Sequence, residues 1–375
     1  MNSSTSSSDP HRRYVQGIAA LALIPLLALF ALGVYLEPLW GDLTRVGGYS
    51  EKEFGWNKSQ LEFPEPLASL GKYERYHDVV VLGDSYSTHR PNLQWQNYIV
   101  AATGWSVATL DSKQVALKQV LASQAFRETP PKLFILQTVE RALPGRLPPR
   151  INDEQTCDAP SQSRQVAKSP LPPDSAWATR LMEAEKIGKH VKRGTAWSDV
   201  QLKYVLRYLA ATLTRELAGD AYTTAVKVEL STRAPFSSAN KEAMLVYTDD
   251  FRKVEWWSAM GLAEMNCRIE RMRDQVEANG VTRFVLMVAP DKLTAYADFL
   301  ADTQSRGISS LAQLAEQQPE TLPRLDRALI SRIRHGEQDV YLPDDTHWGS
   351  SGNRIAAEAL LQFLTQRGWD PARAN

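Results

Sequence analysis

An uncharged apolar run near the N-terminus constrains this 375-residue chain more than any other feature. Residues 15–36 read VQGIAALALIPLLALFALGVYL, and about 20 apolar residues are enough to cross the hydrocarbon core of a bilayer. A small-x-small triplet at 31–33 resembles a signal-peptidase site, but the apolar run continues beyond it. We therefore expect an uncleaved transmembrane signal anchor at 14–36, with a disordered cytoplasmic tail at 1–13.

Charge and cysteine content limit the location and the partners. Arg12 and Arg13 precede the apolar run, so the N-terminus is expected in the cytoplasm and the residues after the single span outside it. Lys+Arg and Asp+Glu both number 43, a balance that argues against a nucleic-acid partner. Cys157 and Cys267 either pair or stay free, and without clustered ligands they predict no metal site. No cofactor is expected.

Beyond a connector at 37–77, strand and helix patterns alternate, which is typical of an α/β fold with a parallel sheet. The expected strands are 79–82, 105–110, 133–136, 284–289 and 339–342. The expected helices are 92–103, a helix from 112 towards 126, 175–190, 198–218, 250–279, 294–300, 321–334 and 353–366. The sequence between about 144 and 244 loosens into proline-rich loops and two helices, so we interpret it as an insertion within one domain at 78–370.

The segment VVVLGDSYS at 79–87 places a serine just after a buried strand. Open α/β sheets hold their sites at the carboxyl ends of the strands, so Ser85 is a candidate nucleophile. Gly83 allows the chain to bend tightly, and backbone N–H groups after the strand can face a developing oxyanion. The alternative is an ordinary polar turn, in which Asp84 holds the backbone.

A second polar cluster, PDDTHWGSSGNR, follows the last expected strand and leads into a helix. A serine nucleophile requires a base, and a carboxylate that fixes the tautomer of that base. His347 can supply the base, and either Asp344 or Asp345 has the spacing to supply the acid. Both clusters belong to the same edge of one parallel sheet, which favours a site over two unrelated turns.

These motifs resemble the SGNH (GDSL-type) hydrolase superfamily and, more narrowly, the periplasmic alginate O-acetyltransferase group. The resemblance is carried by GDSYS at 83–87, LFILQTVERAL at 133–143, VLMVAPDKLTAYADFL at 285–300 and DTHW at 345–348. It implies a three-layer parallel-sheet domain in which Ser85 is the nucleophile, His347 the general base and Asp345 the acid that orients it.

The chain departs from that group in two ways. In the alginate enzymes the D-x-H-W segment precedes the serine segment, whereas here Ser85 comes first, as in ordinary SGNH hydrolases. The G-x-N-D block of the superfamily, with its asparagine oxyanion donor, is absent; the residues after the 133–136 strand are instead QTVER. Arg141 is a candidate replacement by its position, and a salt bridge is the alternative role for it.

Four further residues have both a functional and a structural interpretation. Lys292 and Tyr296 are four residues apart and either contact substrate or support the neighbouring loop. Trp348 either stacks on a sugar or packs beside the histidine. Trp256, next to a second tryptophan on an expected helix, fits a core or interface position better than a catalytic one.

The resemblance implies a catalytic domain in the periplasm, on a single-pass inner-membrane anchor. It implies an O-acetyltransferase that carries an acetyl group on Ser85 and delivers it to hydroxyls of an exported polysaccharide. It also implies a multispanning membrane O-acyltransferase as the partner that supplies the acetyl group. A carbohydrate esterase with the same catalytic residues is the alternative, as is a non-catalytic polysaccharide-binding scaffold. Nothing in the sequence specifies the polymer.

Overall fold

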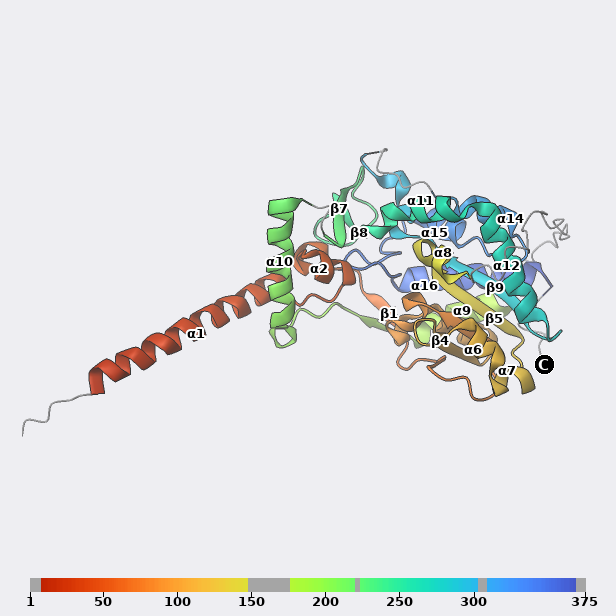
Figure 1. The fold of residues 1–375 in the computed structure, drawn as a ribbon, viewed down its shortest axis with the longest axis horizontal. Helices are drawn as coiled ribbons and strands as arrows, with labels where there is room; N and C mark the ends of the chain where they lie inside the picture. The colour runs from red at the N-terminus through yellow and green to blue at the C-terminus, as the bar shows by residue number, and fades with distance from the viewer. Residues whose placement is uncertain (1–7, 148–175, 220–222, 303–308, 369–375) are drawn as a thin grey trace, which may run out of the picture.

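The computed structural model describes residues 8–147, 176–219, 223–302 and 309–368, and its centre is a five-stranded sheet (Figure 1). Every pair of neighbouring strands in it is parallel. In spatial order the strands are β2 (Ser69–Leu70), β4 (Val107–Asp111), β3 (Val79–Gly83), β5 (Leu133–Val139) and β9 (Arg283–Ala289). The expected α/β fold with a parallel sheet is confirmed.

Alternation along the strands builds a core on each face of the sheet. Val79 and Val81 point into one core and Val80 and Leu82 into the other, as the two-residue period of a strand requires. The first core is closed by α5 (Trp95–Thr103), α9 (Ala176–Ile187), α15 (Leu325–Arg334) and α16 (Ser350–Gln366). The second is closed by α6 (Leu117–Ala122), α7 (Gln124–Glu128), α12 (Leu262–Glu277) and α14 (Leu311–Gln317). The domain therefore has three layers.

The structure corrects three of the expected elements. The predicted strand at 339–342 is not part of the sheet, because Asp339 has a left-handed φ of 55° and Tyr341 makes only an isolated bridge to Trp348. The single helix expected at 250–279 is divided into α11 (Asp249–Met260) and α12 by Gly261, whose φ is 75°. The helix expected from 112 towards 126 is two short helices, α6 and α7.

The fifth strand of the sheet comes from the segment at 37–77, which was expected only to connect the anchor to the domain. This segment contains α2 (Asp42–Gly47), α3 (Glu51–Phe54), β1 (Gln60–Glu62) and β2. β1 pairs with β6 (Lys189–Val191). In the inserted region, α10 (Leu202–Ala218) is followed by a hairpin of β7 (Ala225–Glu229) and β8 (Ala243–Tyr247), which packs on α2 and α3 through a small apolar cluster.

The remaining elements are short. They are α4 (Ser85–Thr88), η1 (Pro91–Leu93), η2 (Glu140–Ala142), α8 (Leu143–Arg146), η3 (Trp197–Asp199), α13 (Lys292–Ala295) and η5 (Ala297–Phe299). Cys267 on α12 is disulfide-bonded, and Cys157 lies outside the described residues.

Helix α1 (Ser8–Leu36) extends away from the domain (Figure 1). From Pro10 to Leu36 it is long and apolar enough to cross a membrane, and nearly all of it is exposed. A soluble core helix would bury such a surface, whereas a helix that spans a bilayer leaves it free for lipid.

Candidate active site

Ser85 is placed by a tight turn at the end of β3, an inner strand of the sheet. It is the first residue of α4, and Asp84 caps that helix by accepting a hydrogen bond from the Tyr86 N–H at 2.9 Å. The other carboxylate oxygen of Asp84 accepts from the Val139 N–H at 2.7 Å and so ties the turn to the end of β5. Asp84 therefore holds the backbone, and Ser85 is left partly exposed at the sheet edge.

Gln137 occupies the region where the superfamily has its asparagine block, and it faces the same turn. Its Oε1 accepts from the Asp84 N–H at 3.2 Å and from the Ser87 hydroxyl at 2.7 Å. Ser87 is fully buried and also accepts from the indole of Trp95, so it is structural. A Cβ at Gly83 would overlap both Cβ and Oγ of Ser87, which explains the glycine at that position.

His347 is held by the acid two residues before it. Its Nδ1 donates to Asp345 Oδ1 at 2.7 Å, and its backbone N–H reaches the same oxygen at 3.1 Å. Among the described residues, Nε2 of His347 has no hydrogen-bond partner although it is buried. His347 and Ser85 line one small cleft together. One imidazole nitrogen is thus fixed by a carboxylate, and the other remains available on a ring that shares the cleft with the serine.

Tyr86 joins the two halves of the site, which are distant in sequence. Its hydroxyl donates to the carbonyl of Thr346 at 2.5 Å. Its ring packs against His347 and Trp348, with centroid distances of 5.0 and 4.9 Å. The residue after the serine therefore positions the loop that carries the histidine.

The pKa values of the two adjacent acids are shifted in opposite directions. Burial raises the pKa of Asp344 well above its ordinary value, and the neighbouring carboxyl of Glu51 raises it further. Burial alone would also raise the pKa of Asp345, but His347 and Arg90 hold it below the ordinary value. The surroundings therefore favour the ionised form of Asp345 beside the histidine and the neutral form of Asp344.

Three neighbours of the histidine were not singled out from the sequence. His89 stacks on His347 with a ring separation of 5.0 Å, Arg90 lies 3.7 Å from Asp345 Oδ2, and Asp42 Oδ2 lies 3.6 Å from His347 Nδ1. The position of His89 four residues after Ser85 was the only available signal. Asp42 comes from the segment expected to be a connector, and no local pattern marks it.

The same residues resemble a metal-binding group. Ligand atoms of His89, Asp345 and His347 lie within 4.8 Å of one another. Asp345 Oδ1 and His347 Nδ1 are hydrogen-bonded to each other, whereas Asp345 Oδ2 and His347 Nε2 have no hydrogen-bond partner among the described residues. The hydrogen bond orients the imidazole, and the two free atoms leave metal binding as an alternative use of the same group.

Arg141 does not line the cleft shared by Ser85 and His347. Its guanidinium donates to Asp250 at 3.1 Å and to Asp291 at 2.5 Å, and it lies over the ring of Tyr247. Burial and the nearby Asp250 carboxyl raise the pKa of Asp291 to about 8. The salt-bridge interpretation of Arg141 thus matches the geometry, and the oxyanion interpretation does not.

Lys292 and Tyr296 hold the backbone of the loop that carries His347, which we call the histidine loop. The buried ammonium of Lys292 donates to the carbonyls of Leu342, Pro343 and Asp345 at 2.8–3.1 Å, and burial lowers the pKa of this lysine to about 8. Tyr296 accepts from the backbone N–H of Tyr341 at 3.2 Å. Trp348 is buried against Tyr86, which is a packing role.

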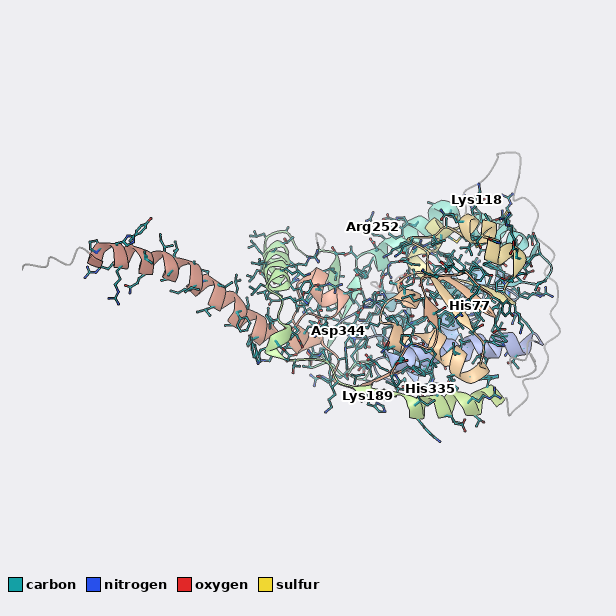
Figure 2. All side chains as sticks on the ribbon, turned by 90° about the horizontal axis from the view of Figure 1, so that it is seen from below. His77, Lys118, Lys189, Arg252, His335 and Asp344 are labelled. Carbon is teal, nitrogen blue, oxygen red and sulfur yellow. The ribbon has the colours of Figure 1, made fainter. Side chains whose placement is uncertain are left out.

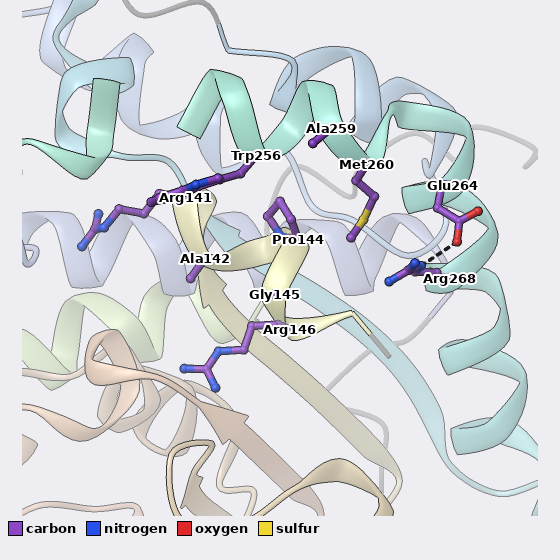
Figure 3. A pocket seen from close by; sticks show the side chains of 10 residues that line it. All are labelled: Arg141, Ala142, Pro144, Gly145, Arg146, Trp256, Ala259, Met260, Glu264 and Arg268. Atoms are coloured by element: carbon purple, nitrogen blue, oxygen red, sulfur yellow. Dashed lines mark hydrogen bonds and ion pairs between the residues drawn. The ribbon is translucent and has the colours of Figure 1, made fainter. Parts of the chain in front are cut away.

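A wider groove opens at the same edge of the sheet, after β5 (Figure 3). Its volume is about 840 Å³, and it lies between η2–α8 and the helices α11 and α12. Its lining includes Arg141, Arg146, Arg268 and Trp256. Glu264 forms an ion pair with Arg268 at 2.7 Å. An aromatic face with polar groups around it is typical of a carbohydrate-binding surface.

The three-layer parallel sheet, the serine at the end of an inner strand and the Asp-His pair before the closing helix define an SGNH-like domain. Comparison with protein families gives the narrower assignment: residues 244–374 match the SGNH hydrolase-like domain of the acetyltransferase AlgX. The match contains Asp345 and His347 but not Ser85, and it supports an acetyltransferase or SGNH-type function. Searches of curated proteins and of solved structures returned no match.

Proposed function

We propose that the protein is a periplasmic O-acetyltransferase that acetylates an exported polysaccharide through an acyl-Ser85 intermediate. The observation that carries this proposal is the set of contacts that His347 makes. Its Nδ1 is bonded to Asp345, whose ionised form is favoured, and its buried Nε2 has no partner among the described residues. The ring shares a cleft with Ser85. This is the arrangement that a general base for a serine requires.

In the first step His347 Nε2 takes the proton of Ser85 Oγ as this oxygen attacks the acetyl carbonyl. The C–O bond to the donor then breaks, and the leaving oxygen takes the proton from His347. In the second step a sugar hydroxyl gives its proton to Nε2 and attacks the acyl carbon. The C–O bond to Ser85 then breaks, and Ser85 Oγ takes the proton back from Nε2 as the acetylated sugar is released. Asp345 stabilises the imidazolium in both steps.

The oxyanion formed in each step needs hydrogen-bond donors. Because Ser85 is the first residue of α4, its own N–H has no carbonyl partner within that helix, and it is our candidate donor. Arg141 is not proposed for this role, because its guanidinium is already held by two buried carboxylates.

The acceptor is proposed to lie in the groove beside Trp256, where a sugar ring can stack on the indole and its hydroxyls can face Arg146 and Arg268. The acetyl donor would be a multispanning membrane O-acyltransferase, reached because α1 anchors the domain at the inner membrane. The exposed apolar surface of α1 supports that anchoring.

Labelling with a serine-directed fluorophosphonate tests the catalytic assignment. The parent chain should form an adduct that mass spectrometry locates on Ser85, and Ser85→Ala should form none. The same substitution should lower acyl turnover by at least about 10³-fold while the melting temperature stays unchanged, because a partly exposed hydroxyl contributes little packing. An unlabelled but folded parent chain would favour the polysaccharide-binding scaffold.

A chelator provides the control for the metal-like grouping of His89, Asp345 and His347. Turnover should be unchanged after treatment with EDTA; a loss that Zn²⁺ restores would contradict the serine mechanism.

To distinguish transfer from hydrolysis, the full-length protein is incubated with an activated acetyl ester and oligosaccharides. Acetylated sugar supports the transferase, and free acetate with every acceptor tried supports the esterase.

A further inference from the structure

Helix α10 is fixed to the domain by one of its faces. Val205 is buried, and the Arg215 guanidinium donates to the carbonyls of Gly47 and Gly48 at the end of α2. The same guanidinium lies 4.2 Å from the ring centroid of Tyr49. These contacts hold α10 against α2 and determine which side of the helix faces away from the domain.

The outward face of α10 is apolar. Leu206, Leu209, Leu213 and Leu217 follow one another at helical spacing, and their exposed fractions are 53%, 40%, 58% and 78%. We call these four residues the leucine stripe. Exposed Arg207 lies about 100° around the helix from Leu206, so a charged flank borders the stripe. A contiguous apolar surface of this kind marks a binding face, because single exposed leucines are common but aligned ones are not.

The leucine stripe adjoins the end of the helix that is long enough to span a membrane. α10 lies across the end of α1 (Figure 1). A Cβ at Gly33 of α1 would overlap the side chains of Val200 and Val205, so the two segments are in direct contact. The Phe30 ring of α1 lies 6.5 Å from that of Trp197.

Exposed aromatic residues gather at this junction. Tyr35, Trp40 and Trp197 are 64%, 42% and 69% exposed, although large aromatic rings usually bury most of their surface. Tyrosine and tryptophan are enriched at the level of lipid headgroups, where their rings meet both apolar and polar surroundings. The junction of α1 and α10 thus has the composition of a membrane–water interface.

We propose that α10 is an interfacial helix whose leucine stripe inserts into the outer leaflet of the membrane that α1 crosses. The occupant is the lipid surface, because α10 contacts the end of α1 near Gly33 and its stripe has a charged flank, as interfacial helices do. This inference rests on the proposed anchoring by α1, and it goes beyond it: α1 alone would allow the domain to stand away from the bilayer.

The placement of α10 determines where the cleft of Ser85 and His347 lies relative to the membrane. α2 lies between α10 and the histidine loop, and its Leu43 N–H donates to the carbonyl of Asp344 at 3.0 Å. Figure 2 shows Asp344 at the end of the domain nearer to α1. With α10 in the interface, the cleft of Ser85 and His347 is held close to the membrane surface, where a membrane-embedded acetyl donor would present its group.

The test uses the full chain in vesicles of phosphatidylethanolamine and phosphatidylglycerol. Single cysteines are introduced as Leu213→Cys in the stripe, Arg207→Cys on the charged flank and Ile24→Cys within α1, and each is labelled with an environment-sensitive fluorophore without reductant. The parent chain, labelled in parallel, corrects for any label on native cysteines. Positions 213 and 207 are both exposed, so neither label should disturb the core.

The label at 213 should show blue-shifted emission, quenching by nitroxide lipids and protection from aqueous iodide, and the label at 207 should show the reverse. If the label at 24 is quenched by lipid while that at 213 is open to iodide, α1 spans the membrane and the α10 proposal is overturned. Iodide access at 24 would instead overturn the anchoring itself. A label at 213 that is shielded from iodide but not quenched by lipid would overturn the lipid assignment in favour of a covering protein.

Discussion

At the scale of single residues, the site depends on two adjacent aspartates with different surroundings. Asp345 faces His347 and Arg90, which favour its ionised form. Asp344 is buried beside Glu51, whose carboxylate also accepts hydrogen bonds from the Gly41 N–H and the Thr44 hydroxyl. The surroundings therefore favour a negative charge at Asp345, which is bonded to the histidine, and a neutral carboxyl at Asp344, the residue before it.

Asparagine substitutions at the two positions should separate these roles. Asp345→Asn keeps the size of the side chain but removes the charge that stabilises the imidazolium, so kcat should fall by about 10³- to 10⁴-fold. Asp344→Asn is the matched control: it replaces a neutral acid by a neutral amide that can still donate to Glu51, and kcat should change little. Equal losses of kcat in the two variants would contradict the assignment of Asp345.

The Asp344 variant also predicts a pH dependence of stability. Because the pKa of Asp344 in the folded protein lies well above its ordinary value of 3.8, the folded state holds a proton that the unfolded state releases above that pH. The wild-type free energy of unfolding should therefore decrease as pH rises from about 3.8 through the folded pKa, and Asp344→Asn should lack this decrease. Urea unfolding of both proteins at pH 3.5 and pH 8 measures it. A stability difference that does not grow with pH would contradict the prediction.

At the scale of elements, the strand–turn–helix of β3 and α4 determines where Ser85 points. Asp84 and Gln137 supply the polar contacts of the turn, and Gly83 allows the backbone to approach Ser87. The histidine loop is held in a comparable way by Lys292, whose ammonium binds three of its carbonyls. Both segments are fixed by buried side chains of other elements, Gln137 on β5 and Lys292 on α13.

A double-mutant cycle tests the close approach in the turn. Gly83→Ala should lower the free energy of unfolding by about 1–3 kcal/mol, because the new methyl group overlaps the Ser87 side chain. Ser87→Gly alone should also destabilise, through loss of its bonds to Gln137 and Trp95. The double variant should be less destabilised than the sum of the two, since Ser87→Gly removes the overlapping atoms. Strict additivity in urea unfolding would refute the overlap.

At the scale of the whole molecule, the cleft and the groove occupy one edge of the sheet but are lined by different elements. Ser85 and His347 are carried by the segments that follow β3 and precede α16, whereas the groove lies between η2–α8 and α11–α12. If the proposed function holds, substitutions in the groove should alter binding of a long acceptor without altering chemistry at Ser85.

Trp256→Ala should raise the KM for an oligosaccharide acceptor by roughly tenfold, because the stacking face is lost. Its kcat for a small soluble acetyl ester should be unchanged, because that substrate needs only the cleft. Trp197→Ala, which removes an exposed indole beside α1, is the matched control and should change neither value. A change in ester kcat with Trp256→Ala would show that the groove is not a separate binding surface.

The sequence by itself determined the features that depend on local patterns. Runs such as VVVL and FVLMVA have the composition of buried strands, and β3 and β9 formed there because every residue of such a run can be covered in a parallel sheet. The serine turn and the Asp-x-His segment could also be predicted, because the residues that form a turn are consecutive in the sequence. The strand order β2-β4-β3-β5-β9 could not be predicted, because it depends on pairing between distant segments.

Only the tertiary structure decided between Asp344 and Asp345, and between the two roles of Arg141. Both aspartates have a spacing that fits His347. Glu51 raises the pKa of Asp344 and Arg90 lowers that of Asp345, and both groups are distant from the aspartates in sequence. Arg141 is likewise taken out of the cleft by Asp250 and Asp291. The physical reason is that the pKa of a carboxyl, and the ion pairs of an arginine, depend on burial and on every group within a few ångströms. Neither can be read from the sequence.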